Sequence, residues 1–139
     1  MISHPVIKDS EAKRLPYLQA CIMEDLGMWP PLTGLASKVA PPQGETVNGI
    51  FIPGGVEVAF NPLMTMRRKD VFGDDAKIFR PERWIEADAT TRHKYERTAE
   101  LVFGSGRFGC LGKNIAMIEL NKIFVEVGFK AVNTVQCLI

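Results

Sequence analysis

The sequence predicts a single α+β domain that is mainly α-helical. Three observations support this fold class. The 139 residues are enough for one hydrophobic core. Apolar residues recur at helical spacing near both ends of the chain, while short alternating apolar runs with turn dipeptides occupy the middle. A composition of 46% hydrophobic and 24% charged residues is that of an ordinary globular protein.

Charge and cysteine content exclude several classes of protein. The chain has 17 Lys and Arg against 16 Asp and Glu, so it lacks the strong positive field that attracts nucleic acid or anionic lipid. No uninterrupted apolar run exceeds four residues, as in 115–118, whereas a membrane span needs roughly 20. The three cysteines lie far apart and form no CxxC pair, which excludes a disulfide framework and a zinc ribbon.

The first predicted element is an amphipathic helix from Pro16 to Leu26. Its apolar residues step by three or four positions, as on one face of a helix. Pro16 suits the first turn, and Gly27 followed by Pro30 suits the end.

The middle of the chain predicts a small antiparallel β unit. Two short strands flank Asn48-Gly49, a dipeptide typical of tight hairpin turns. Alternation from Val56 to Phe60 predicts a further strand. From Asn61 to Phe103 the pattern is mixed, and we expect little regular structure there.

A second amphipathic helix is predicted to begin near Leu111 and to end at Gly128. The predicted buried stripe comprises Ala116, Leu120, Ile123, Phe124 and Val127, with Lys113, Glu119, Asn121 and Glu126 mostly off it.

A glycine-rich loop before this helix carries the candidate chemistry. Cys110 lies at the predicted start of the helix, where free backbone N–H groups and the helix dipole favour a thiolate. A single thiolate with no nearby protein co-ligand suggests a metal that brings its own equatorial ligands, which is haem. The spacing alone leaves an ordinary buried cysteine equally open.

A dinucleotide-binding module is a third interpretation of the loop. Gly104, Gly106 and Gly109 fit GxGxxG, and Glu126 follows at a suitable distance. That fingerprint needs a buried strand before it and a parallel sheet after it, and the sequence predicts neither.

The motifs together resemble the C-terminal part of a cytochrome P-450, a haem-thiolate monooxygenase. Phe103, Gly106, Cys110 and Gly112 match the cysteine signature Phe-x-x-Gly-x-x-x-Cys-x-Gly. Residues 17–24 resemble the Glu-x-x-Arg helix, and residues 79–84 resemble the Pro-Glu-Arg-aromatic motif of the meander. The residues within and around these motifs are most similar to those of fungal members, including pisatin demethylase-like enzymes. The resemblance implies a partial domain over residues 1–139, without the central oxygen-activating helix and the N-terminal part.

The resemblance also implies roles for individual residues. Cys110 is expected to be the axial iron ligand, with Phe103 packed on the sulfur side and Gly106 and Gly112 allowing close approach of the loop. The other expected contacts to haem, at its propionates, come from the basic residues Lys38 and Arg107. An exposed loop lysine is the competing interpretation of Lys38, and a solvated surface is expected for Arg67 and Arg68.

Two departures from the family pattern matter. Gly27 stands where the family has the arginine of Glu-x-x-Arg, so only Glu24 and Arg83 remain of a structural charge network. Phe108 stands where an arginine often precedes the cysteine by two residues. We expect the loss at Gly27 to affect folding and haem retention more than chemistry, since a charged hydrogen bond contributes about 1.5–3 kcal/mol.

The function implied is oxidation of an apolar small molecule, with one atom of O2 incorporated and electrons supplied by an NADPH-dependent reductase. We expect the fragment alone to be inactive. A partly folded remnant that seeks a partner is the alternative from another class of function. Family members are often anchored to the endoplasmic reticulum by an N-terminal helix that has no counterpart in this sequence.

Overall fold

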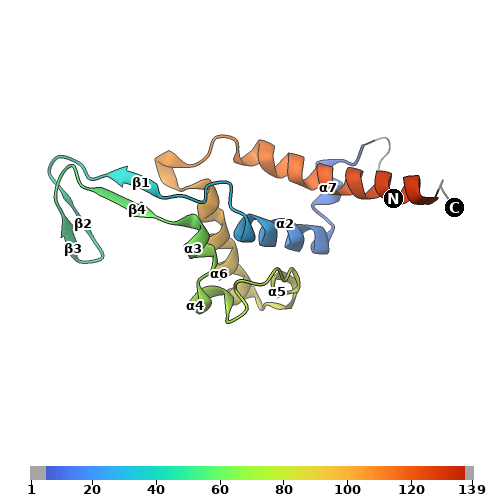
Figure 1. Cartoon of the computed structure of the whole chain (residues 1–139), viewed down its shortest axis with the longest axis horizontal. Coiled ribbons are helices and arrows are strands. Elements are labelled where there is room, and N and C mark those ends of the chain that lie inside the picture. Colours follow the sequence, from blue (N-terminus) through green and yellow to red (C-terminus); the bar gives the residue numbers. More distant parts are fainter. Residues whose placement is uncertain (1–5, 137–139) are drawn as a thin grey trace.

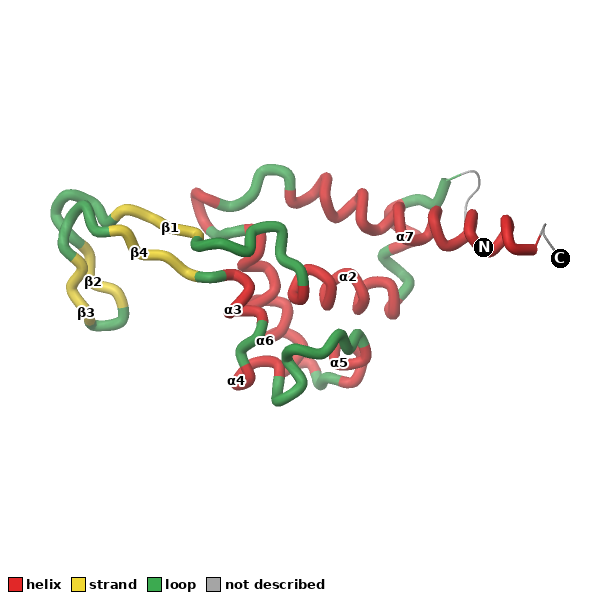
Figure 2. Tube along the Cα trace, in the orientation of Figure 1, coloured by secondary structure: helices red, strands yellow, loops and turns green. Residues whose placement is uncertain are grey.

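The fold class is confirmed by a computed structural model, which describes residues 6–136 (Figures 1 and 2). The ends of the predicted 1–139 domain lie outside the described residues. Helices dominate, and the strands form two small antiparallel sheets. The helices are α1 Asp9–Ala12, α2 Pro16–Met28, α3 Pro62–Met66, α4 Lys69–Phe72, α5 Glu82–Glu86, α6 Ala89–Ala99 and α7 Lys113–Gln136, and the strands are β1 Ala36–Val39, β2 Glu45–Val47, β3 Ile50–Ile52 and β4 Glu57–Phe60.

Helix α2 starts at Pro16 as predicted but extends through Gly27 to Met28. The helix then ends because Pro30 cannot continue it; the last helical bond runs from the Trp29 N–H to the Asp25 carbonyl at 2.8 Å. Gly27 is therefore an interior helical residue and not a cap.

The strands form a narrow ribbon that extends away from the helices (Figures 1 and 2). The hairpin of β2 and β3 turns at Asn48 and Gly49, with φ of 50° and 81°, as the dipeptide predicted. Pairing of β1 with β4 was not predicted, and it aligns Lys38 with Val58. Lys38 is thus exposed but lies on a strand and not in a loop, as the competing interpretation had it.

The expectation of little regular structure before residue 103 is wrong for α6. Its N-cap is Asp88, whose side chain accepts hydrogen bonds from the N–H groups of Thr90 and Thr91 at 2.8 and 3.0 Å. The helix packs on a small core shared by α2, α3, α4 and α5. Three aromatic rings meet in this core, with centroids 5.0–6.2 Å apart: Phe72, Trp84 and Tyr95.

Helix α7 differs from the prediction in both its length and its buried face. It begins at Lys113 and continues past Gly128. Asn121, predicted to lie off the buried stripe, is fully buried, whereas Ile123 and Val127 on that stripe are exposed. The buried face is set by polar partners, because the Asn121 carboxamide accepts from Gln19 and donates to Asp9, both at 2.8 Å.

A further bond joins the beginning of the described chain to α7. The Ile7 N–H donates to the Glu126 carboxylate at 2.8 Å, and Ile7 itself is buried. Glu126, which the dinucleotide-binding interpretation placed at a ligand, holds the N-terminal segment instead.

Candidate cofactor site

The loop that carries Cys110 folds back on itself. The Cys110 N–H donates to the Phe103 carbonyl at 2.7 Å, so the two ends of the loop meet. Gly104 makes this possible: its φ is 73°, and a Cβ at this position would lie 2.8 Å from the Phe108 carbonyl oxygen. Only glycine combines that conformation with that approach. Sequence reasoning missed this position, although Gly104 is part of the glycine-rich run itself.

The surroundings of Gly106 and Gly112, the two glycines of the cysteine signature, leave more space for a side chain than those of Gly104. Gly106 has φ of 56° but faces open space. A Cβ on Gly112 would lie 3.8 Å from the Cys110 sulfur, an ordinary contact distance. Within the loop, the closest backbone approach is therefore the one at Gly104, and the expected roles of Gly106 and Gly112 toward haem remain predictions.

Cys110 precedes α7 rather than opening it. The helix starts at Lys113, two residues later than predicted, and the Cys110 carbonyl accepts from the Lys113 N–H at 3.4 Å. The cysteine is free and exposed, so the simple buried cysteine that the sequence left open does not occur.

Cys110 lines a cavity of about 360 Å³ between the loop and the base of the β ribbon. The volume is in the range of small-molecule and cofactor pockets. Its apolar wall includes Leu32, Leu101, Val102 and Phe103, and the charged side chain of Lys38 lies on the β1 side. The structure thus brings Lys38, Phe103 and Cys110 to one cavity.

Arg107 contacts the ring of Phe108, which lines the cavity. The Lys38 ammonium lies 3.1 Å from the centroid of the Phe108 ring, and the Arg107 guanidinium carbon lies 4.7 Å from it. Both are cation–π contacts. Phe108, singled out in the sequence only as a departure, is the residue that connects the two predicted basic contacts.

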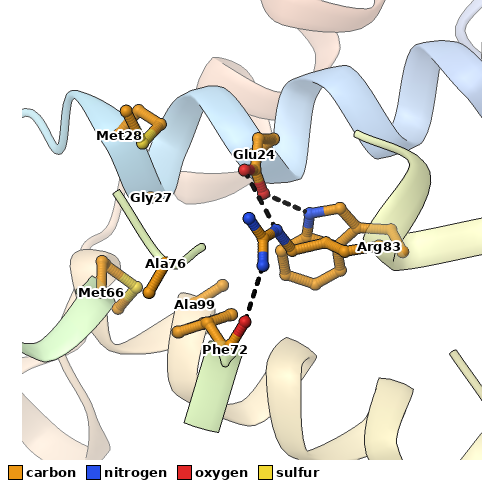
Figure 3. Close-up of a pocket in the computed structure, with 9 residues that line it drawn as sticks. Glu24, Gly27, Met28, Met66, Phe72, Ala76, Arg83 and Ala99 are labelled. Atoms are coloured by element: carbon orange, nitrogen blue, oxygen red, sulfur yellow. Dashed lines mark hydrogen bonds and ion pairs between the residues drawn. The ribbon is translucent and has the colours of Figure 1, made fainter. Parts of the chain in front are cut away.

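Glu24 and Arg83 form a buried ion pair, 3.2 Å between Oε1 and Nε (Figure 3). Glu24 also accepts from the Trp84 indole N–H at 2.8 Å and from the Arg80 backbone N–H at 2.9 Å. Three donors therefore bind this carboxylate without an arginine at position 27.

Arg83 is bonded over its whole guanidinium group. It donates to the carbonyls of Phe72 at 2.7 Å and Ile78 at 3.1 Å, and to the Asp75 side chain at 3.0 Å. Hydrogen bonds from Arg80, which has the larger effect, and from Arg83 hold the pKa of the Asp75 carboxyl below its usual value. This network fixes the segment of residues 72–83 on α2.

Gly27 borders a cavity of only about 10 Å³ beside this network (Figure 3). A Cβ at Gly27 would lie 3.9 Å from the Met66 Cβ, so an alanine fits. The space holds at most one water and has no room for a guanidinium group. The neighbouring Arg67 is half-buried, and one of its guanidinium nitrogens donates to the Met28 carbonyl at 3.5 Å. The solvated surface expected for Arg67 is thus wrong.

The dinucleotide-binding interpretation does not fit this arrangement. Residues 100–103 form a 3₁₀ turn where the fingerprint requires a strand. In residues 6–136, all strand pairs are antiparallel.

The comparisons with known proteins decide the family. A sequence profile of cytochrome P-450 matches residues 3–127. The chain belongs to the cytochrome P-450 family. Similar proteins include the cytochrome P-450 monooxygenase ABA1 of Pyricularia oryzae, 46% identical over 91% of this chain and 25% of that protein. Another is the cytochrome P-450 monooxygenase abl1 of Leptosphaeria maculans, 49% identical over 90% of this chain and 22% of that protein.

A solved cytochrome P-450 has the same fold. The retinoic acid-bound cyanobacterial CYP120A1 is 27% identical with a TM-score of 0.66, over 81% of this chain and 25% of that one. The chain spans about a quarter of the length of the curated relatives it matches. None of the helices in the described part of the chain is both long enough and apolar enough to cross a membrane.

Haem is the cofactor of the cytochrome P-450 family, and the donor set of this chain fits it. Cys110 is free and exposed and lines the cavity, and a thiolate is one of the protein ligands that haem iron takes. The wall beside it is apolar, as a porphyrin face requires, and cations lie at the rim, where carboxylates would end.

Proposed function

We propose that Cys110 is the axial thiolate of a haem monooxygenase. The observation that carries the proposal is the free, exposed Cys110 that lines a largely apolar cavity, on a loop closed by the hydrogen bond from the Cys110 N–H to the Phe103 carbonyl. Haem held by this thiolate would supply the activation of O2, because electron density donated by the sulfur favours cleavage of the O–O bond. The Phe103 carbonyl anchors the Cys110 backbone, and Gly104 allows the turn of the loop between them.

The residues at the rim would bind the polar edge of the cofactor. Lys38 and Arg107 supply positive charge for the propionates. Glu24 and Arg83 act away from the cavity and hold the meander in place. The substrate would be an apolar small molecule, and electrons would come from an NADPH-dependent reductase.

We expect residues 1–139 alone to bind haem without oxidising a substrate. Residues 104–111 are all exposed, so this chain by itself leaves the cysteine side open to water. Monooxygenase chemistry needs a closed site that keeps water from the reacting centre.

The test is the absorption spectrum of the purified chain with haem, reduced under carbon monoxide. The wild-type protein should show the Soret band of a thiolate ligand, and Cys110→Ser should lose it. Cys21→Ser is the matched control and should keep the band, since Cys21 lies on α2. Identical spectra for C110S and the wild type would refute thiolate ligation.

A non-catalytic interaction fragment is a second candidate, favoured by one observation. Helix α7 exposes large apolar residues over several turns, with Ile115 64%, Ile123 55% and Val127 61% exposed. Such surfaces mark interfaces or cause aggregation. Size-exclusion chromatography separates the two proposals: a haem-free monomer at all concentrations counts against an interaction fragment.

A further inference from the structure

The side chains of Lys38, Arg107 and Phe108 form a cation cluster at the rim of the Cys110 cavity. Lys38 comes from β1, and the other two residues come from the cysteine loop. Both cationic groups lie within 5 Å of the same ring centroid. Two positive charges are therefore held close together by segments about 70 residues apart in the chain.

These two cations differ from other basic residues of the chain. Lys113 is paired with Glu100 at 2.8 Å, and Arg80 is paired with Asp75 at 2.8 Å. Neither Lys38 nor Arg107 forms an ion pair among the residues whose side chains are described. Like charges repel, so two cations on one ring without a carboxylate partner favour the binding of an anion beside them.

The geometry of the backbone fixes both sides of the cluster. Lys38 is held in register by the pairing of β1 with β4. Phe108 is held by the turn at Gly104. The backbone of Gly104 approaches the Phe108 carbonyl so closely that a Cβ at position 104 would lie 2.8 Å from its oxygen. Phe108 is 53% exposed, so it contributes little to the core, and its ring contacts both cations.

We propose that Phe108 is a positioning residue that orders Lys38 and Arg107 for the two carboxylates of a porphyrin. The inference rests on the proposed haem site and explains how the chain manages without an arginine at position 108. Free Lys and Arg side chains lose conformational entropy when they bind an anion. Cation–π contacts with one ring order both side chains before the anion arrives.

Iron-free protoporphyrin IX and its dimethyl ester test this role without the iron–sulfur bond. The whole chain should bind the diacid more tightly than the diester in fluorescence titrations. Phe108→Leu should weaken diacid binding about tenfold, because two long side chains must be ordered anew, and should leave diester binding unchanged. Phe108→Tyr keeps the ring face and should retain wild-type affinity for both.

A readout on the porphyrin-free chain controls for folding. The ring current of Phe108 should shift the NMR signals of the Lys38 side-chain methylenes in the wild type and F108Y, and F108L should lose that shift. Adding F108L to Lys38→Met should weaken diacid binding less than F108L weakens it in the wild type, since one of the two side chains that the ring orders is already absent.

Three results would overturn the inference: equal affinity of the wild type for the two porphyrins, no binding of either, or an F108L chain that keeps the preference for the diacid. Failure of thiolate ligation is distinguishable. Cys110→Ser should bind both iron-free porphyrins like the wild type, so only the carbon monoxide spectrum reports on the sulfur.

Discussion

Arg83→Met is expected to be the most damaging single change to the charge network. The side chains of Arg83 and Glu24 are 4% and 7% exposed. Removing one partner of a buried pair costs about 3–5 kcal/mol, because the other charge stays buried without compensation. Glu24 keeps its bonds from Trp84 and the Arg80 N–H, so we expect about 3 kcal/mol. That is a large part of a typical stability of roughly 5–15 kcal/mol.

Urea unfolding followed by tryptophan fluorescence measures this loss, since Trp84 is buried beside Glu24. Arg80→Met is the matched control. Its guanidinium is 43% exposed and pairs with Asp75 and Glu86 at the surface, where an ion pair contributes about 0.2–1 kcal/mol. In the extreme form of the expected result, R83M is already unfolded without urea while R80M remains folded.

A double variant checks the reasoning about uncompensated charge. Glu24→Gln combined with R83M leaves a neutral amide where the buried carboxylate was, so it should be more stable than R83M alone. The reasoning is refuted if R83M lies within about 1 kcal/mol of R80M, or if the double variant is less stable than R83M.

Three further predictions concern the helices and the acid range. Gly27→Ala should stabilise the chain by roughly 0.5–1 kcal/mol through helix propensity, and Gly27→Arg should gain no more, because Glu24 already has three donors; a higher melting temperature for G27R than for G27A would contradict this. Asn121→Ala should lower the free energy of unfolding by about 1–3 kcal/mol and speed amide exchange at Ile7, whereas Glu119→Ala on the exposed face of α7 should stay within about 0.5 kcal/mol of the wild type. The pKa of Asp75 is lowered in the folded chain, so its contribution to the free energy of unfolding is complete above the unfolded pKa of about 3.9 and is lost as the pH falls through the folded pKa. On acidification the free energy of unfolding should therefore fall less for Asp75→Asn than for the wild type. An equal fall for both proteins would exclude this contribution.

Local signals predicted the elements that depend on neighbouring residues. Asn48-Gly49 located a hairpin because its backbone preference alone determines the turn. Asp88 offered the same kind of signal for α6, as an N-cap, but the polar composition after it concealed the helix. β1 had no such signal, since its four residues are ordered by pairing with β4, about 20 positions later.

The buried face of α7 was beyond pattern reasoning for a different reason. Apolar periodicity identifies a helix, but Asn121 is buried through partners on α1 and α2, and no count of apolar positions reveals them. The sequence indicated Phe103, Arg107 and Cys110 in the cysteine loop and Lys38 far from it in the chain, and the structure groups them around one cavity and one ring. The contribution of Phe108 depends on the side chains beside it, which only three-dimensional proximity supplies.

The bonds between the first segment and α7 have a consequence for how the protein is made. Ile7, Asp9 and Gln19 find their partners 119, 112 and 102 residues later in the chain. During translation these groups stay hydrated until α7 has left the ribosome. Contacts of such long sequence separation form late and slowly, so residues 7–19 can dock on α7 only after that helix has been made.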